Sequence, residues 1–201
     1  LSLGNALMSK SRRAKPSNQV RIIGGDWRGR KLHFPSIDGL RPTPDRIRET
    51  LFNWLSAHIS GAHCLDLFAG SGALGFEALS RGASSCYFVD NNKQVLTALS
   101  SSAQTLNCHD RATTILADST FPIPLEQPID LVFLDPPFAS QRLASTLDWL
   151  CNSPMINADT LIYIESAKGR QLPASQVTVI KEKTAGDVTS RLVRRDERCL
   201  S

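Results

Sequence analysis

Between residues 64 and 165 the chain alternates short apolar runs with segments of helical periodicity. The apolar runs predict strands over residues 64–68, 85–90, 113–118, 129–135 and 160–165, and the segments between them predict helices over 72–81, 94–106 and 139–151. Such alternation is typical of an α/β fold in which helices cover both faces of a mostly parallel sheet. Two further runs, 176–183 and 188–194, flank Ala185-Gly186-Asp187 and predict a C-terminal antiparallel hairpin, which brings the sheet to seven strands.

Four of the predicted strands end on an acidic residue, namely Asp90, Asp118, Asp135 and Glu165. In open α/β sheets the ligand crevice lies just outside the carboxyl ends of the strands. The four acids are therefore expected around one crevice. An acid that follows a strand can also be a simple turn or capping residue, and this alternative is stronger for any one of the acids than for all four.

The composition fits one catalytic domain with a small appendage. A chain of 201 residues, 41% of them hydrophobic, can bury the core of one α/β domain. No apolar stretch is long enough for a membrane helix, and the N-terminus lacks the apolar segment of a signal peptide, so we expect a cytoplasmic protein. Five scattered cysteines favour reduced thiols and do not indicate a metal site.

The charges are distributed unevenly along the chain. The first 18 residues hold four basic side chains and no acid, whereas residues 51 to 180 hold six basic and eleven acidic ones. Basic ends on an acidic catalytic body suggest that a polyanion is gripped outside the reaction centre; a merely solubilising tail is the alternative. We therefore divide the chain into a basic flexible tail (1–18), an extension (19–43) that is expected to contact the polyanion and a catalytic domain (44–201).

The extension begins with a predicted β-hairpin. Residues 20–23 and 31–34 are short apolar runs joined by a glycine-rich turn. The tip of this hairpin carries Arg28, Arg30 and Lys31. Basic side chains at an exposed turn are candidates for phosphate contacts.

A helix is expected directly after the extension. Thr43 is expected to cap it, with Pro44 in its first position and Asp45 in its positive first turn. Apolar residues then recur at helical spacing, Arg46 and Arg48 fall on other faces, and the helix is expected to end near Gly61.

A glycine-rich loop follows the first strand of the alternating region. Residues 70–75 read Gly-Ser-Gly-Ala-Leu-Gly between a strand and a helix, which allows a tight turn and close approach of a ligand. Asp90 lies 20 residues after Gly70, at the end of the next strand, where a carboxylate accepts the hydroxyls of a ribose. The motif alone fits NAD as well as S-adenosylmethionine.

Asp66 favours S-adenosylmethionine. This acid precedes Gly70 by four residues and would lie poorly beside a pyrophosphate. Near a sulfonium cofactor that bears an ammonium group, a carboxylate is instead attracted. A buried acid that bonds loop amides is the alternative, and it is compatible with a cofactor role.

The sequence Asp135-Pro136-Pro137-Phe138 follows the apolar run 131–134 and lies at the carboxyl end of a strand. Two prolines fix φ and contribute no N–H donors, so the turn is rigid and its carbonyls point outward. Such carbonyls can accept N–H bonds from a substrate. An ordinary turn between a strand and a loop is the alternative.

Both motifs resemble those of known methyltransferases. Residues 66–72 resemble motif I of class I S-adenosylmethionine-dependent methyltransferases, which have a Rossmann-like fold, and Asp135 to Phe138 resembles the (Asn/Asp)-Pro-Pro-(Tyr/Phe) motif of amino methyltransferases. The second resemblance implies that Asp135 and the Pro136 carbonyl accept the hydrogens of the target amine while Phe138 stacks on the base. The first implies that the cofactor is bound by Asp66, Phe68, Ala69, Gly70, Ser71 and Gly72, by Asp90 at the ribose and by Asp118 at the adenine.

The N-terminal half resembles one particular family. Residues 20–32 and 40–55 are similar to the bacterial small-subunit ribosomal RNA guanine-N2 methyltransferase D family. The resemblance implies methylation of a guanine N2 amine of 16S rRNA, in assembled or assembling small subunits, by a protein that we expect to be monomeric. We expect RNA contacts from Arg28, Arg30, Lys31, Arg41 and Arg46. The chain departs from the family at Asn91-Asn92, where a second acid is common.

Other functions remain open from the sequence. An enzyme acting on adenine N6 of DNA would use the same Asp135 motif, although 201 residues leave little room for a target-recognition domain. A glutamine-methylating enzyme and a catalytically silent RNA-binding assembly factor are further alternatives. If the extension only binds RNA, removing residues 1–34 should abolish rRNA methylation and spare cofactor affinity.

Overall fold

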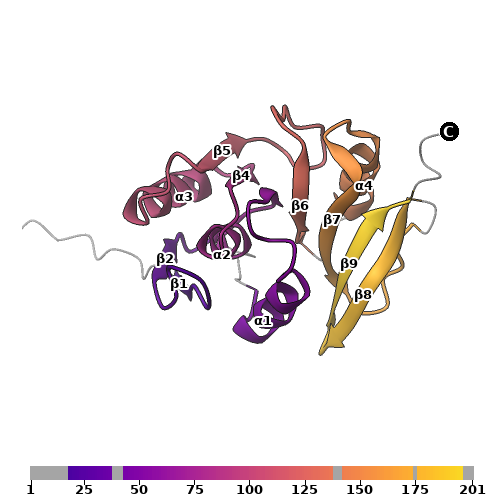
Figure 1. Ribbon diagram of the computed structural model, residues 1–201, viewed down its shortest axis with the longest axis horizontal. Helices are drawn as coiled ribbons and strands as arrows, with labels where there is room; N and C mark the ends of the chain where they lie inside the picture. The colour runs from indigo at the N-terminus through magenta and orange to yellow at the C-terminus, as the bar shows by residue number, and fades with distance from the viewer. Residues whose placement is uncertain (1–17, 38–42, 138–141, 174–175, 197–201) are drawn as a thin grey trace, which may run out of the picture.

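The computed structural model describes residues 18–37, 43–137, 142–173 and 176–196, and its centre is a seven-stranded sheet (Figure 1). The strands lie in the order β5-β4-β3-β6-β7-β9-β8. The first five in this order are parallel, and β9 is antiparallel to both of its neighbours. The strands are β3 (His63–Leu67), β4 (Ser85–Asp90), β5 (Ala112–Leu116), β6 (Ile129–Leu134), β7 (Ile156–Ala167), β8 (Val177–Ala185) and β9 (Val188–Arg195). This confirms the predicted α/β fold with a mostly parallel sheet and a C-terminal hairpin.

The strand order reverses beside β3. Strands β4 and β5 lie on one side of β3, whereas β6 and β7 lie on the other. A reversal of this kind opens a crevice at the carboxyl ends of the strands, because the connections leave it in opposite directions. The crevice is therefore expected between the ends of β3, β4 and β6.

Both faces of the sheet are covered. One buried cluster packs the sheet against α2 (Ala73–Ser80) and α3 (Lys93–Thr105), and it includes residues of α1 (Asp45–Trp54). The other packs it against α4 (Arg142–Asn152). Side chains of β6 alternate between the two clusters, since Leu131 and Phe133 join the first and Val132 and Leu134 the second. Within the described ranges no helix is long and apolar enough to cross a membrane.

The N-terminal hairpin shares the core of the first cluster. Its strands, β1 (Asn18–Arg21) and β2 (Lys31–Phe34), pair antiparallel as predicted. Val20, Leu32 and Phe34 are buried in the same cluster as α2 and α3. The hairpin turn also bonds the end of α2, because the Asp26 amide donates to the Ser80 carbonyl at 2.8 Å. The hairpin is thus packed on the catalytic fold.

Gly25 explains why this turn is rich in glycine. Its φ is +72°, and a Cβ at this position would lie 1.9 Å from the Ser80 carbonyl oxygen. Only glycine lets the hairpin approach α2 so closely.

The start of α1 differs from the expectation. Pro44, and not Thr43, is the N-cap residue, and no side chain caps this helix end. The Thr43 hydroxyl instead donates to Asp135 at 3.3 Å. The prediction was wrong because a capping threonine and a threonine bonded to a distant carboxylate have the same local sequence.

Two further expectations for α1 were also wrong. The helix ends at Trp54, well before Gly61, whose amide donates to the Gly82 carbonyl at 2.8 Å. Arg48 does not face solvent, since its side chain is completely buried. Helical spacing predicts charged residues on the outer face, but here the Arg48 guanidinium forms an ion pair with the buried Glu77 carboxylate.

Candidate active site

The glycine-rich loop turns sharply after β3. Phe68, Gly70 and Gly72 have φ values of 60°, 51° and 72°, and the Gly72 amide donates to the Ala69 carbonyl at 2.8 Å. Gly72 is the N-cap residue of α2, and a Cβ there would lie 2.5 Å from Leu99 Cδ2. Ala69, Gly70, Ser71 and Gly72 are buried, whereas Phe68 is partly exposed. The loop therefore leads directly into the N-terminus of α2.

Asp90 joins the end of β4 to this loop. Its Oδ2 accepts the Gly70 amide at 3.1 Å, and its Oδ1 accepts the Asn92 amide at 2.9 Å. A carboxylate has about four acceptor sites, so Asp90 retains capacity for the hydroxyls of a ribose. The predicted ribose ligand and the predicted cofactor loop are thus hydrogen-bonded to each other.

Asp66 lies under the loop. Its Oδ2 accepts the Gly75 amide at 2.9 Å in a buried position. Burial raises the pKa of this carboxyl well above its ordinary value, although the Gly75 bond acts in the opposite sense. Asp66 therefore holds the start of α2, which is the structural role left open by the sequence; its contact with a cofactor stays a prediction.

Asp118 lies just after β5, in a turn of its own. Its Oδ1 accepts the Thr120 amide at 3.0 Å and the Thr120 hydroxyl at 2.8 Å. These bonds, the backbone one first, lower the pKa of Asp118. The group is ionised at neutral pH and keeps acceptor capacity on Oδ2, as an adenine amino group requires.

Asp135 begins the proline turn at the end of β6. In the parallel pairing of β3 and β6, Leu67 lies opposite Leu134, so the glycine loop and Asp135 leave the sheet side by side. Burial raises the pKa of Asp135 to about 6, and the hydrogen bond from Thr43 partly offsets this shift. Pro136 is buried. Phe138, the predicted stacking residue, lies outside the described residues.

A second buried acid adjoins Asp135, and the sequence had marked it only as a strand end. Glu165 of β7 accepts the Tyr163 hydroxyl at 2.9 Å. Burial, followed by repulsion from Asp135, raises the pKa of Glu165 to about 8. Near pH 7 the two carboxyls together therefore carry about one negative charge. The contacts of Thr43 with Asp135 and of Tyr163 with Ser190 were missed, because they join segments far apart in the chain.

The chain resembles known proteins over nearly all of its length. Residues 20–194 match the family described as Conserved hypothetical protein 95. The chain is also 43% identical to the Ribosomal RNA small subunit methyltransferase D of Haemophilus influenzae over 190 residues, which cover 92% of this chain and 98% of the relative. The Escherichia coli K12 protein of the same name is 43% identical over 182 residues, covering 90% and 92%. This chain belongs to the methyltransferase D family.

A solved structure supports the family assignment. The putative methyltransferase yhhF of Escherichia coli superposes with a TM-score of 0.78 at 43% identity, covering 89% of this chain and 99% of that one. The fold is therefore that of a Rossmann-like methyltransferase, and a member of the methyltransferase D family requires a methyl donor. Among the described residues, no group of three or more His, Cys, Asp and Glu side chains gathers as a metal site would need.

The basic residues predicted to bind RNA lie on two elements of this methyltransferase. Arg28, Arg30 and Lys31 are exposed along the hairpin, and Arg30 donates to the Thr105 carbonyl at the end of α3 at 3.2 Å. Arg46 is exposed on α1. Arg41 lies outside the described residues.

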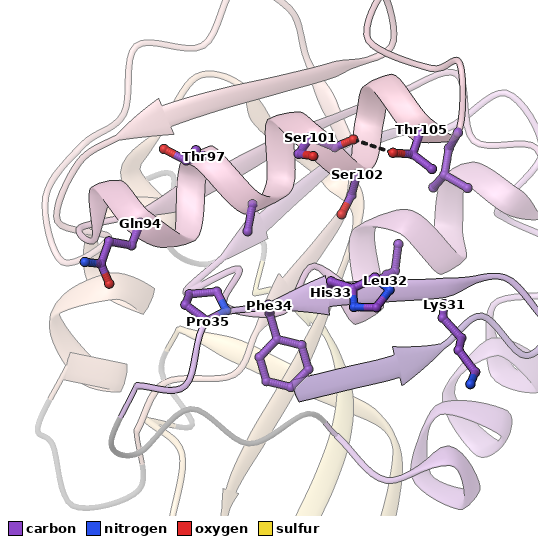
Figure 2. A pocket seen from close by; sticks show the side chains of 12 residues that line it. Lys31, Leu32, His33, Phe34, Pro35, Gln94, Thr97, Ser101, Ser102 and Thr105 are labelled. Atoms are coloured by element: carbon purple, nitrogen blue, oxygen red, sulfur yellow. Dashed lines mark hydrogen bonds between the residues drawn. The ribbon is translucent and has the colours of Figure 1, made fainter. Parts of the chain in front are cut away.

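A groove separates the hairpin from α3 (Figure 2). It has a volume of about 360 Å³. Hydroxyl groups line its α3 side, at Thr97, Ser101, Ser102 and Thr105, and Lys31 lies on the β2 side. Gln94, in the first turn of α3 and four residues after Asp90, lies at one end of the groove.

Proposed function

We propose that this protein transfers a methyl group from S-adenosylmethionine to the exocyclic N2 amine of a guanine in 16S ribosomal RNA, within the assembled or assembling small subunit. One observation carries the proposal. The pairing of Leu67 with Leu134 puts the glycine loop beside Asp135, so a cofactor on the loop and an amine on the proline turn would be neighbours. The printed names of the relatives, which are ribosomal RNA small subunit methyltransferases, support the substrate.

The residues around the loop fit S-adenosylmethionine. Asp90 and Asp118 supply acceptor oxygens at the ends of neighbouring strands, which suits a ribose and an adenine amino group. The surrounding carboxyls also favour a positively charged ligand. When bound, the cofactor supplies an electrophilic methyl group on a sulfonium sulfur.

Asp135 and Pro136 prepare the amine. The lone pair of an amine on a guanine ring is delocalised, so the group is a poor nucleophile. Two acceptors, the Asp135 carboxylate and the Pro136 carbonyl, orient the two hydrogens and direct the lone pair away from the ring plane. Positioning and electrostatics then assist an in-line displacement in which an N–C bond forms as the C–S bond breaks. The Asp135 carboxylate, which would already bond the amine, can accept the proton released afterwards.

The hairpin side of the molecule is proposed to grip the RNA. Arg28, Arg30, Lys31, Arg41 and Arg46 gain affinity for phosphates through counterion release. In the groove beside the hairpin, Thr97 and Thr105 donate to carbonyls of their own helix, so Ser101 and Ser102 are the hydroxyls proposed to contact phosphate and sugar oxygens. These contacts position the RNA, and recognition of the base is left to the proline turn.

The experiment is methylation of small subunits purified from a strain that lacks the enzyme. The wild-type protein, incubated with labelled cofactor, should transfer label to 16S rRNA, and mass spectrometry of RNA fragments should locate it on guanine N2. Asp135→Ala should be inactive while still binding the cofactor. Unlabelled subunits, label at a position other than guanine N2, or an active Asp135→Ala protein would each contradict the proposal.

A further inference from the structure

Thr43 brings a hydroxyl group from the N-terminal segment to the proline turn. Its side chain is buried, and Oγ1 donates to Asp135 Oδ2 at 3.3 Å. The same hydroxyl is near enough to Glu165 to lower the pKa of that carboxyl. Thr43 thus adjoins two acids, one just after β6 and one near the end of β7, although 92 residues separate it from Asp135 in the chain.

Arg48 holds the backbone of Thr43 in place. Its Nε donates to the Thr43 carbonyl at 3.2 Å, and its other nitrogens reach the Arg21 carbonyl at 2.8 Å and the Glu77 carboxylate at 3.5 Å. Glu77 also accepts the Ile23 amide at 2.8 Å. Because Arg48 and Glu77 are fully buried, these bonds cannot be exchanged for water at low cost. One hydrogen-bond network therefore connects the end of β1, at Arg21, and Ile23 just beyond it to Thr43, which contacts Asp135.

Hydroxyl groups adjoin both acids. A hydroxyl has one hydrogen, and Thr43 donates it to Asp135. The Tyr163 hydroxyl lies 2.9 Å from Glu165 and 3.1 Å from Ser190 Oγ. Thr43 therefore bonds Asp135 directly, whereas Tyr163 bonds Glu165.

We propose that Thr43 is a positioning residue for methyl transfer, whose hydroxyl orients the Asp135 carboxylate toward the target amine. The inference rests on the proposed function, since the orientation of Asp135 matters only if this group binds the amine. It extends that function by giving the N-terminal segment a part in the reaction besides RNA binding.

The charged surroundings of Asp135 determine what loss of the hydroxyl should do. Among the described residues, Asp66 of β3 and Glu165 and Tyr163 of β7 are titratable groups that interact with Asp135. The bond from Thr43 favours the ionised form of Asp135 and lowers its pKa. Removing the hydroxyl should therefore raise the pKa of Asp135.

The first test needs no substrate. Thr43→Val keeps the shape of the side chain and removes its hydroxyl, whereas Thr43→Ser keeps the hydroxyl. Titration of the Asp135 carboxyl carbon by NMR should show a higher pKa in Thr43→Val and a value near wild type in Thr43→Ser. Thr160→Val is the matched control, since Thr160 is a buried threonine whose hydroxyl bonds the Ile129 carbonyl at 2.7 Å, at the opposite end of the sheet. An Asp135 pKa in Thr43→Val that equals the wild-type value would overturn the inference.

The second test measures methylation of small subunits by the same proteins. Loss of one hydrogen bond to a charged group should lower kcat about tenfold to hundredfold in Thr43→Val. KM for subunits should change little, and Thr43→Ser should recover most of the rate. If kcat in Thr43→Val is normal although the Asp135 pKa has shifted, or if only KM for subunits changes, Thr43 is not a positioning residue. Failure of the proposed function would be recognised separately, by an Asp135→Ala protein as active as wild type.

Discussion

Asp135 and Glu165 are neighbouring carboxyl groups whose pKa values lie on opposite sides of neutrality. Burial raises both, to about 6 and about 8. An ionised carboxyl accepts hydrogen bonds on both oxygens, so Asp135 can accept Thr43 on one and, in the proposed reaction, the target amine on the other. Repulsion between the two carboxyls makes it harder for both to be ionised at once.

The rate of methylation should follow the ionisation of Asp135. As the pH falls through about 6, Asp135 takes up a proton and kcat should fall with it. Asp135→Asn keeps one acceptor oxygen but has no charge to lose, so it should be slower at pH 8 and show no fall near pH 6. A pH profile of kcat for both proteins checks this. An acidic fall at the same pH in Asp135→Asn would assign the titration to another group.

Glu165 should make stability depend on pH. Its pKa is raised from 4.5 to about 8 in the folded protein, so between these values the folded state holds a proton that the unfolded state releases. The contribution to stability is present at low pH and is lost as the pH rises through about 8. Glu165→Gln removes this dependence and should stabilise the protein by roughly 1–3 kcal/mol at pH 8.5.

Urea unfolding at pH 5.5 and 8.5 measures the effect of Glu165→Gln. Relative to wild type, the variant should have a higher free energy of unfolding at pH 8.5 and nearly the same one at pH 5.5. Glu126→Gln, at an exposed position, is a suitable control because its environment should not change on folding. Equal gains at both pH values would indicate a packing effect.

At the scale of elements, the first turns of α1 and the middle of α2 are joined by the pair Arg48 and Glu77. Both side chains are completely buried, and Asp45 and Arg81 add contacts at 2.6 and 2.8 Å. Breaking a buried pair by removing one partner leaves an uncompensated charge, whereas replacing both partners costs far less. The pair should therefore show strong coupling in a double-mutant cycle.

Arg48→Leu should destabilise the protein by about 3–5 kcal/mol. Arg48→Leu/Glu77→Leu should recover part of this loss, because no charge is then left buried alone. Urea unfolding of the two single variants and the double variant gives the coupling energy. Additive losses would mean that the two groups do not depend on each other.

The elements of the sheet were predictable, whereas the contacts between distant segments were not. Strands such as β4, over residues 85–90, were predicted in full because a short apolar run bounded by turn residues typically forms a strand. The contact between the glycine-rich loop and Asp90 was also predictable, since both lie at the carboxyl ends of strands. Arg48 and Thr43 were misplaced because helical spacing and capping preferences are local rules, and each residue meets a partner that only the fold brings near.

At the scale of the whole molecule, the hairpin is both a candidate RNA grip and part of the core. Ile22 and Leu32 are at most 2% exposed, so deleting residues 1–34 would expose the apolar surface that covers α2 and α3. Loss of activity in such a truncation would not separate RNA binding from folding. Charge reversal at the surface does separate them, because it leaves the buried side chains in place.

Arg28→Glu/Lys31→Glu should weaken binding to small-subunit RNA without changing cofactor affinity. Both side chains are exposed, and each phosphate contact that is lost should reduce the slope of log affinity against log salt concentration by about 0.7 to 0.9. The matched control is Lys181→Glu/Lys183→Glu, which makes the same change in net charge at exposed positions of β8, far along the sheet from the hairpin (Figure 1). Filter binding across a salt series and calorimetry with the cofactor measure the two affinities. An equal loss of RNA affinity in the control would mean that net charge, and not the hairpin, attracts the RNA. A lower salt slope in the hairpin variant alone would place the RNA-binding surface on the hairpin, beside the groove.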